Sequence, residues 1–253
     1  NKLYGRDILL SDFWTYPSIS TLTEALAGDR RSAMVALNKR TNAPAVFCFP
    51  PIAGFGAVFS GLAEQLSYAC YSFDIVADID WLAYSIAAIK QVQAQGPYVL
   101  LGYSAGGNYA YNVAAALQNQ GEQVRALILI DSIRITAVSV LSEQEKQDVI
   151  ESALQESLLI TLDKERMRTT MTAYLDFILQ HPNHSGLAAE LFCLNAQDRG
   201  GLSLPDNGFS CDWSTSTSST VSLYQGAGNH FQVLAPPQLA HNAKIIQGIL
   251  DTL

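Results

Sequence analysis

The stretch from Tyr98 to Gly107, YVLLGYSAGG, constrains the fold of this chain more than any other part of the sequence. Its four leading apolar or aromatic residues indicate a buried parallel strand, and an apolar, helix-period run follows from Ala105 to about Leu117. Between the two lies Gly-x-Ser-x-Gly, with Ser104 at its centre. A serine in a sharp strand-to-helix turn crowds both flanking glycine positions, where only very small side chains fit. The pattern therefore predicts an exposed, nucleophilic hydroxyl at the positive end of a helix.

The composition limits the classes of function. The 253 residues suffice for one α/β domain with an insertion and a sizeable core, and 49% of them are hydrophobic. A formal net charge of −8 argues against a nucleic-acid partner, because phosphate contacts need clustered Lys and Arg. No apolar run reaches the ~20 residues of a membrane span, and no signal peptide is recognised. We expect a globular protein without a membrane span.

The four cysteines, Cys48, Cys70, Cys193 and Cys211, lie far apart and form no Cys-x-x-Cys motif. Three of them fall in strand-like apolar runs. This distribution favours buried free thiols in a reducing compartment over a zinc site. We therefore expect a cytoplasmic protein that binds no metal.

Residues 1–43 differ in character from the rest of the chain. The run from Asp7 to Leu22 reads as a short helical piece, a turn at Pro17 and a second helix start, and residues 28–41 are polar and basic, as in a linker. The first run resembles the C-terminal tail of an acyl- or peptidyl-carrier domain. The alternative is an ordinary amphipathic N-terminal arm. Because the sequence begins without a methionine, we expect it to be a piece of a longer protein.

From Pro44 onward, near-continuous apolar strands alternate with helix-period runs. Strands are expected at about 45–49, 69–73, 98–101, 124–131, 190–195 and 220–224. Such strands indicate a parallel sheet that is covered on both faces. Right-handed crossovers then bring the loops after the strands, and Ser104 with them, to one edge of the sheet. The predicted fold class is α/β, a mostly parallel, doubly wound sheet over residues 44–253.

This alternation stops after Ser132. Two helices in succession are predicted where a strand is due, the first opened by a capping box of Ser142 with Glu145 and the second running from about Asp163 to Leu179. We interpret residues 135–188 as an inserted helical lid, which is mobile and shapes a pocket for an acyl chain. The alternative is that the apolar faces of these helices only pack on the core.

A serine hydroxyl needs a base that removes its proton as it attacks. His230 is the best candidate, because it follows the last expected strand in a glycine-rich turn, on the edge that carries Ser104. The acid that would orient this histidine has two candidates. Asp131 ends the strand after the nucleophile unit, and Asp198 follows the next strand. Spacing alone does not separate them.

Four motifs in order carry a resemblance to a known family. They are PPIAGFG at 50–56, GYSAGG at 102–107, IDS at 130–132 and GNHF at 228–231. Together they look like the thioesterase domains that terminate nonribosomal peptide and polyketide synthases, which have the α/β-hydrolase fold. The likeness covers about residues 44–253 and is weakest in the lid. The stretch from Arg199 to Asp212 does not align, so its role is not assigned.

The resemblance implies a catalytic triad of Ser104, Asp131 and His230. It places the donors of the oxyanion hole on the backbone N–H groups of Ile52 and Ala105. The substrate would be an acyl, peptidyl or polyketide chain on the phosphopantetheine of an upstream carrier domain, so this chain itself needs no bound cofactor.

Release of the acyl chain would use water or a nucleophile of the chain itself. The same triad serves both routes, and we lean to macrocyclisation because the lid faces are apolar. A stand-alone serine esterase and a proofreading (type II) thioesterase are the alternative functions. Neither would be expected to carry a carrier-domain tail. A non-catalytic binding protein would be expected to lose the serine, the histidine or the glycines of the elbow.

Overall fold

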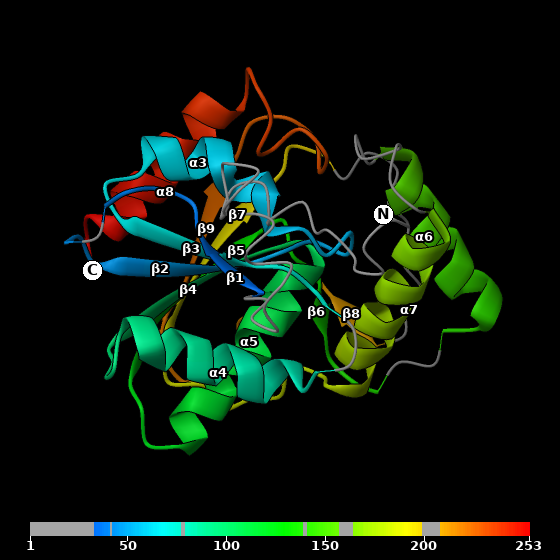
Figure 1. Cartoon of the computed structure of the whole chain (residues 1–253), viewed down its shortest axis with the longest axis horizontal. Coiled ribbons are helices and arrows are strands. Elements are labelled where there is room, and N and C mark those ends of the chain that lie inside the picture. Colours follow the sequence, from blue (N-terminus) through cyan, green and yellow to red (C-terminus); the bar gives the residue numbers. More distant parts are fainter. Residues whose placement is uncertain (1–32, 41, 77–78, 139–140, 157–163, 199–207) are drawn as a thin grey trace, which may run out of the picture.

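A seven-stranded sheet forms the centre of the computed structural model, which describes residues 33–40, 42–76, 79–138, 141–156, 164–198 and 208–253 (Figure 1). In spatial order its strands are β1 (Met34–Ala36), β3 (Ala69–Phe73), β2 (Ala45–Phe49), β4 (Tyr98–Tyr103), β5 (Val124–Ile130), β7 (Glu190–Asn195) and β9 (Val221–Gln225). Strand β1 runs antiparallel to β3, and every other neighbouring pair is parallel. The prediction of a mostly parallel sheet is confirmed.

Helices cover both faces of this sheet (Figure 1). Helices α4 (Trp81–Val92) and α5 (Ala105–Asn119) lie on one face, and α3 (Ser60–Gln65), preceded by the short 3-10 helix η1 (Gly56–Phe59), lies with α8 (Leu239–Leu250) on the other. Strand β2 shows why two cores form. Its residues alternate, so that Phe47 and Phe49 join the core under α4 and α5, whereas Val46 and Cys48 join the core under α3 and α8. The doubly wound arrangement is the predicted one.

The sheet begins earlier in the chain than the sequence suggested. The prediction that residues 28–41 form a linker is wrong for Met34–Ala36, which pair with β3 as an edge strand. Ala33 and Val35 are buried, and the Leu37 N–H donates to the Cys70 carbonyl at 2.8 Å. Three residues beside basic and polar neighbours are too few to show a period, so pattern reading missed this strand. The predicted carrier-domain tail, from Asp7 to Leu22, lies outside the described residues.

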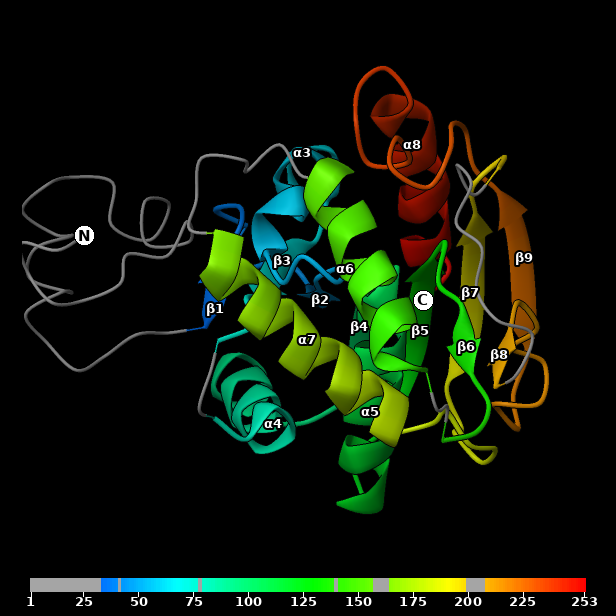
Figure 2. The ribbon, with the colours of Figure 1, turned by 90° about the vertical axis from the view of Figure 1, so that its right-hand side faces the viewer.

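The lid contains the two predicted helices, α6 (Glu143–Glu156) and α7 (Lys164–Gln180), which lie side by side over one end of the sheet (Figure 2). The predicted capping box is present, since Glu145 accepts from both the Ser142 N–H and its hydroxyl at 2.7 Å. Two ion pairs join the helices, Lys146 with Asp176 at 2.6 Å and Arg168 with Glu151 at 2.5 Å.

The two ends of the lid meet at its base. Strand β6 (Arg134–Ile135), which pairs with β8 (Phe209–Ser210), leads into the lid. The Asn183 N–H donates to the Ile135 carbonyl at 2.7 Å, and the Ile135 N–H donates to the Asn183 side chain at 3.2 Å. The buried Arg134 guanidinium also donates to the Asn183 carbonyl, at 2.9 and 3.1 Å. The lid therefore leaves and rejoins the fold at one point.

All four cysteines are free thiols. Cys48, Cys70 and Cys193 are buried as predicted, and Cys211 is exposed. Burial raises the pKa of Cys70 and of Cys193 to about 12, so both stay protonated. Among the described residues, no helix combines the length and the apolar character that crossing a membrane requires.

Candidate active site

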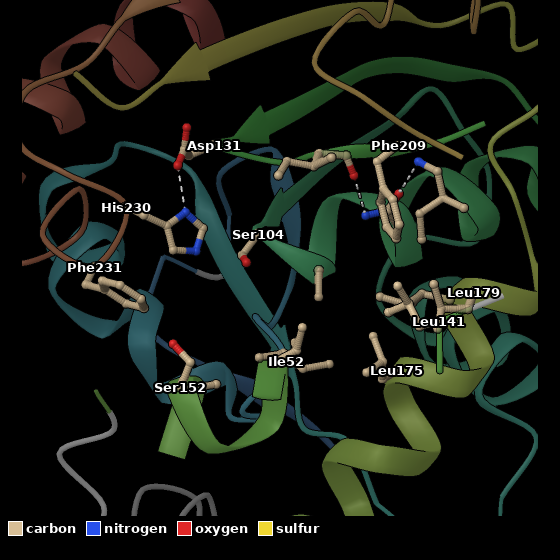
Figure 3. Close-up of a pocket in the computed structure, with 17 residues that line it drawn as sticks. Ile52, Ser104, Asp131, Leu141, Ser152, Leu175, Leu179, Phe209, His230 and Phe231 are labelled. Carbon is tan, nitrogen blue, oxygen red and sulfur yellow. Dashed lines mark hydrogen bonds and ion pairs between the residues drawn. The ribbon is translucent and has the colours of Figure 1, made fainter. Parts of the chain in front are cut away.

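Ser104 occupies the sharp turn between β4 and α5. Its backbone lies in the positive-φ region, with φ 56° and ψ −125°, which a residue with a side chain rarely adopts. The Ser104 N–H donates to the Ile130 carbonyl at 2.9 Å, which fixes the turn to the neighbouring strand. The turn directs the hydroxyl into a cavity at the end of the sheet (Figure 3).

The two glycines of the motif are required by close backbone contacts. A Cβ atom at Gly102 would lie 2.3 Å from the Gly106 carbonyl oxygen. A Cβ atom at Gly106 would lie 2.1 Å from the Phe49 carbonyl oxygen. Both contacts are with backbone atoms, which cannot rotate away, so no other residue fits without moving the turn.

Asp131 follows β5 directly and reaches the histidine of the last turn. Its side chain is buried, and its backbone has a φ of 41°. One carboxylate oxygen accepts from the Ala196 N–H at 3.0 Å, and the other lies 2.6 Å from the Nδ1 atom of His230 (Figure 3). A carboxylate at Nδ1 keeps the proton on that nitrogen and leaves Nε2 free to accept one.

His230 is held in place through its main chain. The Tyr103 hydroxyl donates to the His230 carbonyl at 2.5 Å, and the His230 N–H donates to the Asp198 carbonyl at 3.1 Å. Burial raises the pKa of Tyr103, and the nearby Asp131 charge adds to the shift, so this hydroxyl remains a donor. The imidazole lies between Asp131 and Ser104 (Figure 3). Asp198, the rival acid, meets His230 through a backbone carbonyl, and its side chain is exposed.

Ile52 and Ala105 line the same cavity as Ser104. Ala105 is the first residue of α5, so the helix itself does not use its N–H. Ile52 lies in the loop after β2 and supplies the first N–H after Phe49, because Pro50 and Pro51 have none. Two such N–H groups beside a nucleophile can stabilise an oxyanion.

The cavity around Ser104 is mainly apolar, and both lid helices contribute to its wall (Figure 3). Residues at which the lid reaches the cavity are Leu141, Val149, Ser152, Ala153, Leu175, Ile178 and Leu179. The predicted lid therefore stands where an acyl pocket would need it.

Sequence reasoning missed several residues of the cavity wall. Phe209 on β8 lies in the stretch that could not be aligned, and no periodicity marks it. Asn108 stands four residues after Ser104 on α5, so helical spacing could have placed it on the same face. Its amide donates to the Ile133 carbonyl at 2.9 Å and accepts from the Ile135 N–H at 3.2 Å. Asn108 thus ties the elbow helix to the base of the lid.

A doubly wound sheet with a nucleophile elbow and a buried Asp–His pair at its edge defines an α/β hydrolase. Within that class, residues 44–250 match the family model of the thioesterase domain, so the chain belongs to the thioesterase-domain family.

Similar proteins are multidomain synthases. The chain is 31% identical to one of the polypeptides of the mycosubtilin synthase of Bacillus subtilis, in an alignment that covers all of this chain and 10% of that protein. It is 31% identical to bacitracin synthase 3 of Bacillus licheniformis, over 81% of this chain and 3% of that protein. The chain therefore spans a tenth or less of the length of these relatives.

Solved structures agree on the fold. The thioesterase domain that cyclises the lipopeptide antibiotic surfactin superposes with a TM-score of 0.77 at 23% identity, covering 89% of this chain and all of that domain.

Proposed function

We propose that this chain is the product-releasing thioesterase domain of a nonribosomal peptide synthase. It takes a peptidyl or acyl chain from the phosphopantetheine of an upstream carrier domain onto Ser104 and then releases it. The observation that carries the proposal is the Ser104 elbow beside the Asp131–His230 hydrogen bond of 2.6 Å, at the wall of an apolar cavity. The serine, the histidine and the aspartate form the catalytic triad.

The synthase context is supported by how far the similarity extends. The family model ends at residue 44 on the N-terminal side, whereas the mycosubtilin synthase alignment takes in the whole chain. This extension favours residues 1–43 as the tail of a carrier domain and its linker, although residues 33–37 also join the sheet. It disfavours a stand-alone esterase or a proofreading thioesterase. Relatives that are peptide synthases favour a peptide over a polyketide substrate.

The acylation step follows from the geometry. The Ser104 hydroxyl oxygen attacks the thioester carbonyl while the Nε2 atom of His230 takes its proton. Asp131 holds the imidazole and stabilises its charged form. The N–H groups of Ile52 and Ala105 stabilise the oxyanion of the tetrahedral intermediate. Collapse of this intermediate breaks the carbon–sulfur bond, and the phosphopantetheine thiol leaves with the proton from His230.

Release reverses these roles. His230 removes a proton from the incoming nucleophile, which attacks the ester carbonyl, and returns that proton to Ser104 as the serine leaves. We propose that the nucleophile is a hydroxyl or amine of the bound chain, which gives a macrocycle. The apolar wall supports this route, because a dry cavity lets the folded chain reach the ester before water does.

The compartment of action is the cytoplasm in this proposal. Three buried free thiols suit a reducing environment, and the phosphopantetheine thiol of the carrier needs one as well.

The test uses a peptidyl thioester of a pantetheine mimic that carries a terminal hydroxyl. The wild-type domain should convert it to the cyclic ester, and Ser104→Ala should form neither product nor acyl-enzyme in the mass spectrum. Labelling of the alanine variant by a fluorophosphonate at the wild-type rate would remove the nucleophile assignment. Linear acid alone, across several chain lengths, would leave a hydrolytic domain in place of a cyclase.

A further inference from the structure

The Tyr174 hydroxyl reaches the loop that carries Ile52 from inside the lid. Tyr174 stands on α7 and is fully buried, and its hydroxyl donates to the Pro50 carbonyl at 2.9 Å. Its ring contacts Trp81 and Tyr109 edge to face, with centroids 5.8 and 5.9 Å apart. Burial holds the pKa of Tyr174 well above its usual value, so this group stays a donor at any working pH.

Pro50 and Pro51 make this hydrogen bond important for the loop. Neither proline has an N–H, so only the carbonyls can fix the backbone between Phe49 and Ile52. The Pro51 carbonyl accepts from the Gly54 N–H at 2.8 Å, within the loop itself. The Pro50 carbonyl is bonded to Tyr174, 124 positions away in the chain. The lid helix thus fixes the peptide that directly precedes the Pro51–Ile52 unit.

The same carbonyl lies against the elbow. A Cβ atom at Gly106 would come within 2.5 Å of the Pro50 oxygen, so the loop rests on the first turn of α5, next to the Ala105 N–H. The position of the Pro50 carbonyl therefore sets the separation between the two N–H groups that face the cavity.

We infer that Tyr174 is a positioning residue for the oxyanion hole, which couples the lid helix α7 to the orientation of the Ile52 N–H. This inference rests on the proposed function. Moving a stabilising donor by a fraction of an ångström weakens the transition state more than the bound substrate, because the full charge develops only on the oxyanion. Tyr174 touches no reacting atom and acts through Pro50.

The test compares Tyr174→Phe with Tyr109→Phe. Both changes remove one buried hydroxyl from the same aromatic cluster, but the Tyr109 hydroxyl bonds to the Trp81 carbonyl and to Ser85, both at 2.8 Å, away from the Ile52 loop. With an acyl-pantetheine thioester, Tyr174→Phe should lower kcat about tenfold or more with KM within about twofold, as expected when an oxyanion donor is misplaced. Tyr109→Phe should leave kcat within about twofold, while both variants lose similar melting temperature.

A second readout separates positioning from a purely structural role. An alkyl boronic acid forms a tetrahedral adduct on the serine with an oxygen in the oxyanion hole. Its affinity should fall about tenfold in Tyr174→Phe and stay unchanged in Tyr109→Phe, because only the first variant disturbs the N–H geometry. Equal losses of kcat in both variants, or wild-type kcat and boronate affinity in Tyr174→Phe, would overturn the inference and leave the proposed function standing. No turnover by the wild-type domain would overturn both.

Discussion

The edge of the sheet and the lid above it enclose the same cavity but are held by different forces. At the edge, backbone hydrogen bonds fix the residues that follow the strands. The Ser104 N–H bonds to β5 at 2.9 Å, and the Asp131 N–H bonds to the Leu194 carbonyl of β7 at 2.8 Å. The described residues of the lid between its two ends add no strand to the sheet, and side chains hold them in place. Catalytic atoms therefore stand on the more rigid part, and the cavity wall on the less constrained part.

The comparison also divides the lid itself. Helix α7 is fixed to the core by fully buried Tyr174 and by Met171, which is 1% exposed. Helix α6 buries Ile150 and Leu154 but meets the cavity through the half-buried Val149 and Ala153. Exposed or half-exposed ion pairs join it to α7. We conclude that α7 belongs mechanically with the sheet edge, whereas α6 is the part that can open.

The largest expected effect tests the sheet edge. Asp131→Asn should lower kcat about 10⁴-fold, because the amide cannot hold the imidazole in the required tautomer. Asp198→Asn is the matched control and should change kcat less than about threefold, since its backbone carbonyl is unaffected. Steady-state kinetics on a thioester substrate measures both. The reverse ranking would move the catalytic acid to Asp198.

The next effect compares the two lid helices by stability. Met171→Ala on α7 should lower the free energy of unfolding by about 2–5 kcal/mol, as for other buried large-to-small changes. Val149→Ala on α6 should cost about 1 kcal/mol, because it removes two half-buried methyl groups. Urea unfolding of both variants provides the comparison. Equal costs would mean that α6 is as firmly packed as α7.

Native-state hydrogen exchange measures the opening directly. Amides of α6 should exchange at least about tenfold faster than those of α7, which in turn should approach the protection of β4. This separates the sequence-based expectation of one mobile lid, over residues 135–188, into two parts. Protection in α6 as high as in residues 98–101 would contradict any opening of the lid.

The smallest effect is a pH dependence of α6. Hydrogen bonds from Ser142 hold the pKa of Glu145 below its usual value, and a hydrogen bond from Arg168 does the same for the pKa of Glu151. A carboxylate with a lowered pKa stabilises the native state above its ordinary pKa, and this contribution is lost as pH falls through the lowered value. Protection factors in α6 should therefore decrease relative to β4 on acidification. Glu151→Gln should make this decrease shallower, and an unchanged pH profile would exclude the Glu151 pair as a contributor.

Local sequence was sufficient where the structure is local. The glycines around Ser104 are demanded by backbone contacts within one turn, so their spacing alone predicts the elbow. The capping box at Ser142 and the helices of the lid are local for the same reason. Alternation of apolar strands with helix-period runs was enough to place the parallel strands of the sheet.

Features that depend on distant contacts were not predictable in this way. Asp131 and Asp198 both follow strands at the same sheet edge, and only the fold shows which carboxylate meets Nδ1 of His230. Phe209 reaches the cavity from a polar stretch through a two-residue strand. The hydrogen bond from Tyr174 to Pro50 leaves no trace in either local pattern, because each residue alone fits an ordinary helix or turn.

The closure of the lid base by Ile135 and Asn183 has a consequence for how such domains diversify. An excursion whose ends are tied together by hydrogen bonds of 2.7 and 3.2 Å can lengthen, shorten or change sequence while the chain on either side keeps its path. The triad stands outside this junction. Substrate preference can therefore evolve, or be grafted from another enzyme, by exchanging one contiguous segment, and the chemistry of the recipient is inherited intact.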